Sequence, residues 1–113
     1  MNQRPYQAYD RDKLVELFGD DPRTLAEVER EFLETAREAA REIMGTDDFI
    51  MIARAAHRLK GAAGMIGARA LRQVAEAVER AAKAEDLSTV RRLREMFVPE
   101  VRRVAEQAGV AGE

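Results

Sequence analysis

The chain of 113 residues is long enough for one domain with a single core, and we treat residues 1–113 as that domain. A formal net charge of -2 excludes a global basic field for nucleic acid, and the absence of cysteine excludes disulfides, thiolate catalysis and cysteine-based zinc sites. Hydrophobic residues make up 46% of the chain, without any apolar run of the roughly 20 residues that span a bilayer, so we expect a soluble protein without membrane contact.

The composition is that of helices, because Ala, Glu, Arg and Leu are abundant and aromatic residues make up only 5%. Residues 1–9 are polar and aperiodic, and we expect them to be loosely ordered. Asp10 can cap a short first helix that ends at Gly19. The apolar residues of this helix are Leu14, Leu17 and Phe18.

Two longer helices come next in the sequence. The second begins either at Asp21, with proline in its first turn, or at a capping box in residues 24–27, and it ends at Gly45. Asp47 can cap the third helix, whose stripe of apolar residues at spacings of three and four is interrupted at Gly67. This stripe consists of Phe49, Ile52, Ala56, Leu59, Ala63 and Ile66.

The remaining chain predicts a fourth helix that ends near Asp86 and a fifth that ends at Gly109. Pro99 should kink or split the fifth helix, because it lacks a backbone donor and clashes with the preceding turn. Short connections force neighbouring helices to run antiparallel and to bury their stripes together. We therefore predict an all-α fold, an up-down antiparallel four-helix bundle with the short N-terminal helix as a lid.

His57 is the only histidine, and it lies one position beyond a residue of the apolar stripe, which places it on the flank of the third helix. The residues that share its face are Arg54, Lys60, Gly61 and Gly64. A glycine inside a helix costs roughly 1 kcal/mol relative to alanine, so two of them beside one imidazole indicate an open approach for a bulky partner. The alternative is an ordinary, partly exposed histidine, with Gly64 starting the turn that Gly67 completes.

The charge pattern around His57 favours an anionic ligand or an acidic protein surface. No acidic residue occurs between Phe49 and Ala75. The basic residues of this stretch are Arg54, Arg58, Lys60, Arg69 and Arg72. The alternative is a solvated basic face.

Residues 56–68 read Ala-His-Arg-Leu-Lys-Gly-Ala-Ala-Gly-Met-Ile-Gly-Ala. This string resembles the signature of histidine-containing phosphotransfer (HPt) domains of two-component phosphorelays, which has His-x-Leu-Lys-Gly, small residues, an apolar residue and Gly-Ala. The predicted helices also fit the small bundle of this family. The resemblance implies that His57 is phosphorylated, that Lys60 assists at the phosphoryl group and that Gly61 leaves the approach clear. The main departure is Gly64, where many members carry a small residue that is somewhat larger than glycine.

Glu79 is a further candidate. If the chain reverses at Gly67, residues equally far before and after the turn lie level on the antiparallel pair, which places Glu79 beside His57. A carboxylate that accepts a hydrogen bond from one ring nitrogen fixes the tautomer and leaves the other nitrogen free to attack phosphorus. The HPt resemblance supports this role, because members attached to sensor kinases often have Glu or Gln at this offset. The alternative is a solvated glutamate paired with Arg80 or Lys83.

These features predict a phosphorelay intermediate in which His57 attacks the aspartyl phosphate of a receiver domain and passes the phosphoryl group to another receiver. Lys60, supported by Arg54 or Arg58, would offset the charge of the phosphoryl oxygens. No carboxylate cluster near His57 suits a metal, so we expect no cofactor of its own and Mg²⁺ on the partner. No ATP-binding motif is visible, so the chain should be a stoichiometric phosphocarrier rather than an enzyme.

The expected partners are response-regulator receiver domains, with a hybrid sensor kinase as a further candidate, and no nucleic acid. Candidate docking residues are Leu14, Phe18, Ile50 and Met65. We expect a free, monomeric, cytoplasmic protein. The alternative function is a helical adaptor or inhibitor that binds a kinase or receiver without accepting phosphate. A metal or haem binder is disfavoured, because one histidine without cysteine cannot build such a site.

Overall fold

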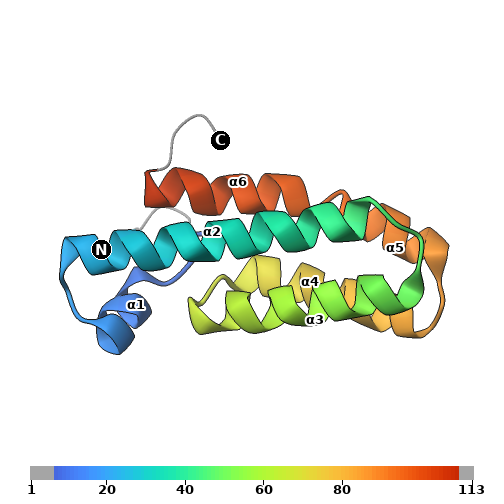
Figure 1. Cartoon of the computed structure of the whole chain (residues 1–113), viewed down its shortest axis with the longest axis horizontal. Helices are drawn as coiled ribbons and strands as arrows, with labels where there is room; N and C mark the ends of the chain where they lie inside the picture. Colours follow the sequence, from blue (N-terminus) through green and yellow to red (C-terminus); the bar gives the residue numbers. More distant parts are fainter. Residues whose placement is uncertain (1–6, 110–113) are drawn as a thin grey trace, which may run out of the picture.

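The computed structural model describes residues 7–109, and this part of the chain folds into helices without a strand. The helices are α1 (Arg11–Phe18), α2 (Pro22–Met44), α3 (Phe49–Met65), α4 (Arg69–Lys83), α5 (Leu87–Arg94) and α6 (Phe97–Ala108) (Figure 1). The prediction of an all-α protein is confirmed. None of the described helices combines the length and the apolar character that crossing a membrane requires.

Aspartate side chains cap the first three helices, as the sequence predicts, but one of the capping residues differs from the prediction. The Asp10 carboxylate accepts a backbone hydrogen bond in the first turn of α1, and Asp21 does the same at the start of α2. The prediction that Asp47 caps the third helix is wrong. Asp48 is the cap, while the Asp47 carboxylate accepts a hydrogen bond from Arg91 at 2.9 Å. The sequence pattern allows a cap at either of two adjacent aspartates. The hydrogen bond to α5 shows which of the two has another partner.

The predicted fifth helix is divided into α5 and α6, with Glu95 and Met96 between them. Pro99 lies in the first turn of α6, where its missing N–H breaks no helical hydrogen bond. In one continuous helix its ring would clash with the carbonyl group of Glu95, four residues earlier. The prediction that Pro99 kinks or splits this segment is confirmed, and the result is a split.

The packing centres on α3. This helix contacts α4 most extensively and also lies along α2, while α6 packs on α2 and α4 (Figure 1). Both α3 and α4 carry buried alanines, and small side chains let two helices approach closely. The largest fully buried side chains are Tyr9, Leu14, Leu25, Leu33, Ile43, Ile52, Leu59, Ile66, Leu71, Val78, Val90 and Phe97. The apolar stripes read from the sequence therefore contribute most of the core.

The segment before α1 is tied to the bundle. Residues 1–6, part of the segment expected to be loosely ordered, lie outside the described residues. For Ala8 and Tyr9 the expectation is wrong, because both are buried and both donate backbone hydrogen bonds to Oε1 of Gln107 on α6, at 2.6 and 3.2 Å. The Tyr9 hydroxyl also donates to the buried carboxylate of Glu29 on α2. These long-range contacts leave no periodic pattern in the sequence.

The turn between α3 and α4 requires glycine at position 67. Gly67 has a φ of 70°, in the left-handed region. A Cβ atom there would lie 2.7 Å from Cβ of Asp10, so a side chain does not fit either. The backbone N–H of Asp10 donates to the carbonyl oxygen of Ile66 at 2.9 Å, which brings the start of α1 against this turn. The turn therefore fixes both the reversal of the chain and the position of α1.

Replacing Gly67 should destabilise the protein, whereas the same change at Gly61 should not. We expect Gly67→Ala to lower the free energy of unfolding by about 1–3 kcal/mol, because of the strained φ and the contact with Asp10. Gly61→Ala is the matched control, since nothing lies within 4 Å of its Cβ position, and it should raise stability by up to about 1 kcal/mol. Urea unfolding followed by circular dichroism measures both, and equal effects would contradict the role of Gly67.

Candidate functional site

His57 and Glu79 meet at the seam between α3 and α4. The His57 side chain is 70% exposed, and its Nδ1 lies 2.9 Å from Oε2 of Glu79. The two residues are far apart in the sequence but come level because α3 and α4 run antiparallel from the turn at Gly67. The structure thus brings together the pair that the sequence register places side by side.

The Glu79 carboxylate is buried and receives three donors. Its side chain is 7% exposed, Lys60 Nζ lies 2.9 Å from Oε1, and Lys83 Nζ lies 3.1 Å from Oε2. The alternative of a solvated glutamate is therefore wrong, although the contact with Lys83 that it included does occur. Arg80 instead pairs with Glu76, one turn earlier on α4. Lys83 is the residue of this cluster that sequence reasoning did not assign to the site, although its i,i+4 spacing from Glu79 was visible.

The protonation of the pair follows from its surroundings. Burial by itself would raise the pKa of Glu79, but hydrogen bonds from Lys60, Lys83 and His57 outweigh burial and lower the pKa from 4.5 to about 2. At neutral pH this carboxylate is ionised and can only accept hydrogen bonds. Nδ1 of His57 must therefore donate. In the neutral ring the lone pair then lies on Nε2, which has no hydrogen-bond partner within residues 7–109.

The two glycines near His57 differ in what surrounds them. Around Gly61 a Cβ atom would meet nothing within 4 Å, so the backbone there is open. At Gly64 a Cβ atom would lie 3.4 Å from Nε of Arg72. The Arg72 side chain therefore borders position 64 at van der Waals distance, and the role of Gly64 in opening the approach to His57 stays a prediction. The backbone N–H of Gly67 donates to the Gly64 carbonyl oxygen at 3.3 Å, a contact that also fits the alternative of a turn that starts at Gly64.

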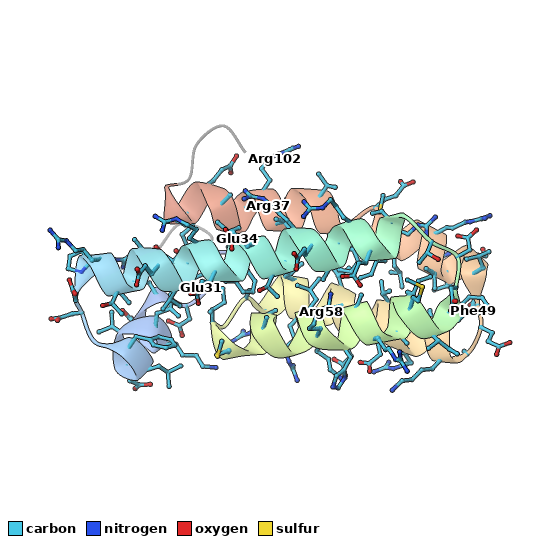
Figure 2. The ribbon with its side chains drawn as sticks, in the orientation of Figure 1. Glu31, Glu34, Arg37, Phe49, Arg58 and Arg102 are labelled. Carbon is cyan, nitrogen blue, oxygen red and sulfur yellow. The ribbon has the colours of Figure 1, made fainter. Side chains whose placement is uncertain are left out.

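The two arginines beside His57 are one helical turn apart on α3 and differ in their partners. Arg58 donates to Glu42 of α2 at 2.8 Å, and Figure 2 shows it between α3 and α2. It is thus directed away from the α4 side, where His57 meets Glu79. Arg54 is exposed and makes no ion pair with another described residue. The predicted positive patch therefore loses Arg58 to a carboxylate partner but keeps Arg54.

The candidate docking residues differ in their exposure to solvent. Leu14 is fully buried, so its assignment to a docking surface is wrong. Phe18, Ile50 and Met65 are exposed, and the last two flank His57 along α3. Sequence periodicity could not distinguish Leu14 from the others, because α1 is too short to show which side faces the bundle. Within residues 7–109 no group of three or more His, Asp or Glu side chains is arranged to hold a metal ion.

The chain belongs to the Hpt domain family, because the family model of the Hpt domain matches residues 23–107. This match includes α3 to α5 and all but one residue each of α2 and α6, and therefore every residue of the cluster around Glu79. Hpt domains are phosphocarrier modules with a phosphotransfer role in two-component signalling, rather than classical enzymes. Comparisons with curated proteins and with solved structures found no match.

The ionised state of Glu79 makes stability depend on pH. Because the folded pKa of about 2 lies below the ordinary value of 4.5, the unfolded chain binds more protons between these values. The contribution of the ionised Glu79 to the free energy of unfolding is complete above pH 4.5 and is lost as the pH falls through about 2. We expect the free energy of unfolding to fall less steeply over this window in Glu79→Gln than in the wild type. Urea titrations at several pH values measure the slopes, with Glu76→Gln as control, and equal slopes would contradict the shifted pKa.

Proposed function

We propose that His57 is the phospho-acceptor of this Hpt domain, taking a phosphoryl group from the aspartyl phosphate of one receiver domain and passing it to another. One observation carries the proposal. An exposed imidazole has Nδ1 bound to a buried, ionised carboxylate, while its Nε2 has no partner in the described part of the chain. A nucleophile needs such a free lone pair in a fixed orientation.

In the forward step the Nε2 lone pair attacks phosphorus in line with the bond to the aspartate oxygen. The Nε2–P bond forms, the P–O bond breaks, and the aspartate carboxylate leaves with the electron pair. Nδ1 keeps its hydrogen, so the ring of His57 becomes positively charged. Glu79, 2.9 Å from Nδ1, offsets that charge without moving. Transfer to a second receiver reverses each step and returns a neutral ring.

Cationic side chains next to His57 suit the phosphoryl group. Lys60 and Lys83 both contact the Glu79 carboxylate that also binds the imidazole, so both ammonium groups lie near the ring. Phosphorylation adds negative charge beside them, and the lysines can share their hydrogen bonds between Glu79 and the phosphoryl oxygens. Arg54, which has no ion pair within residues 7–109, supplies a further charge on the same face of α3. The proposal places Mg²⁺ on the receiver, because phosphoryl transfer needs a metal and charge stabilisation.

The surroundings of His57 can admit a partner domain. The backbone at Gly61 is open, and Ile50 and Met65 expose apolar side chains along the same helix. Exposed apolar residues near the reacting atom are suited to docking.

We take residues 1–113 as one domain in which α2, α3, α4 and the α5–α6 pair form an up-down four-helix bundle. In this proposal the protein acts as a monomeric, stoichiometric carrier in the cytoplasm.

Phosphotransfer to the wild type but not to His57→Gln is the direct test. We expect a receiver preloaded with labelled phosphate in the presence of Mg²⁺ to label the wild type, with acid-labile and alkali-stable label, as an N–P bond requires. His57→Gln should fold normally, because the side chain is exposed, and should take no label. Undiminished label in that variant would exclude His57 as the acceptor. Retained receiver binding without any label on the wild type would favour a non-phosphorylated adaptor.

Glu79 should act by positioning His57, which predicts two linked effects. In Glu79→Gln we expect slower transfer by about tenfold or more, because a hydrogen bond to a charged group contributes about 1.5–3 kcal/mol. The ¹⁵N resonances of His57 should also lose the preference for the Nδ1–H tautomer, which a purely structural role would not change. Glu76→Gln, on the same helix, should change neither quantity. A wild-type tautomer ratio in Glu79→Gln would contradict the positioning role.

A further inference from the structure

A pocket of about 800 Å³ lies at the corner where α1, α3 and α4 meet. Its wall includes the backbone of Gly64 and three basic residues, Lys13 from α1 and Arg69 and Arg72 from α4. Asp10 is the only carboxylate among the described residues that line it. That carboxylate already accepts a hydrogen bond from the backbone of Lys13 as the cap of α1. The side chains that line the pocket therefore carry more positive than negative charge.

The three cations are available to a ligand. The Lys13 ammonium group donates to the Gly64 carbonyl oxygen at 2.8 Å, a contact that holds the ammonium group at the wall without neutralising it. Arg69 and Arg72 are exposed, and neither makes an ion pair within residues 7–109. A Cβ atom at position 64 would lie 3.4 Å from Nε of Arg72, so the Arg72 side chain borders α3 at this position.

The pocket lies on the same seam as His57. Gly64 follows His57 by seven residues, which is two helical turns on the same side of α3 and about 10 Å along its axis. Arg72 precedes Glu79 by the same interval on α4. A typical protein interface covers about 800 Å² on each partner, which corresponds to a radius of roughly 16 Å if it is round. A domain centred on His57 would therefore also cover the pocket.

We propose that this pocket receives acidic side chains of the receiver domain docked on His57, and that Arg69 and Arg72 thereby determine which receivers are accepted. This inference rests on the proposed function. Guanidinium groups bind carboxylates through paired hydrogen bonds, and charges at the edge of an interface steer correct partners and repel wrong ones. A domain that holds Mg²⁺ does so with carboxylates, so its surface near the phosphorylated aspartate is already acidic.

The test measures the second-order rate of phosphotransfer from a Mg²⁺-loaded phosphorylated receiver that transfers to the wild type. We expect Arg69→Glu and Arg72→Glu each to slow transfer by about tenfold at low salt, and the difference to shrink as added salt screens the charges. The matched control is Arg102→Glu, which makes the same change of charge on α6, and Figure 2 shows Arg102 on the side of α6 away from α3. Transfer to the control should stay within about twofold of the wild type.

Labelling by phosphoramidate separates docking from chemistry. In this reaction the N–P bond of the reagent breaks, the Nε2–P bond of His57 forms and ammonia leaves, without a receiver. We expect the same labelling rate in the wild type and all three variants. Equal receiver transfer in Arg69→Glu, Arg72→Glu and the control would overturn the inference, and so would a parallel loss of phosphoramidate labelling. A wild type that neither donor labels would overturn the proposed function itself.

A free oxyanion is the competing occupant. A titration with millimolar inorganic phosphate, in which the NMR resonances of Arg69 and Arg72 are monitored, tests this occupant directly. Resonance shifts on adding phosphate, together with control-like transfer in both variants, would reassign the pocket to a small anion and overturn the docking role. Unchanged resonances with slowed receiver transfer are the result that we expect.

Discussion

The tight reversal at Gly67 sets the register between α3 and α4, and the site depends on that register. A shift of one residue along either helix would rotate its side chains by about 100°, which would separate His57 from Glu79. The positive φ of Gly67 and the close approach of Asp10 leave little freedom for such a shift. The geometry of the imidazole is thus determined by a backbone turn several helical turns away from it.

The buried Glu79 carboxylate shows how the cluster balances its charges. Burying an unpaired carboxylate would be costly, but Lys60, Lys83 and His57 supply donors to both oxygens. The cluster therefore has two ammonium groups for one carboxylate before any phosphoryl group arrives. In the proposed transfer, the incoming phosphoryl group would meet positive charge already in position, while the same carboxylate would maintain the orientation of the ring.

The surface around His57 is asymmetric. On the α2 side, Arg58 is paired with Glu42, whereas on the α4 side Arg72 borders Gly64 and has no carboxylate partner in the described part of the chain. Between them, Gly61 leaves the backbone bare. The surroundings of Gly61 and Gly64 thus differ in this chain: no other residue lies within 4 Å of a Cβ position at Gly61, and Arg72 borders the same position at Gly64. This asymmetry favours one orientation of an acidic partner.

The helices, the break at Pro99, the family motif and the position of Glu79 level with His57 could all be predicted from the sequence. These features depend on local capping, on the 3.6-residue period and on counting across one short turn, so neighbouring residues are sufficient to predict them. Other features depend on the packing of the helices: the burial of Leu14, the attachment of Tyr9 to α2 and α6, and the contact of Lys83 with Glu79. Each depends on how far one helix is rotated and shifted against another. Apolar periodicity defines the buried face of a helix, but it does not define which polar side chains meet at its edges.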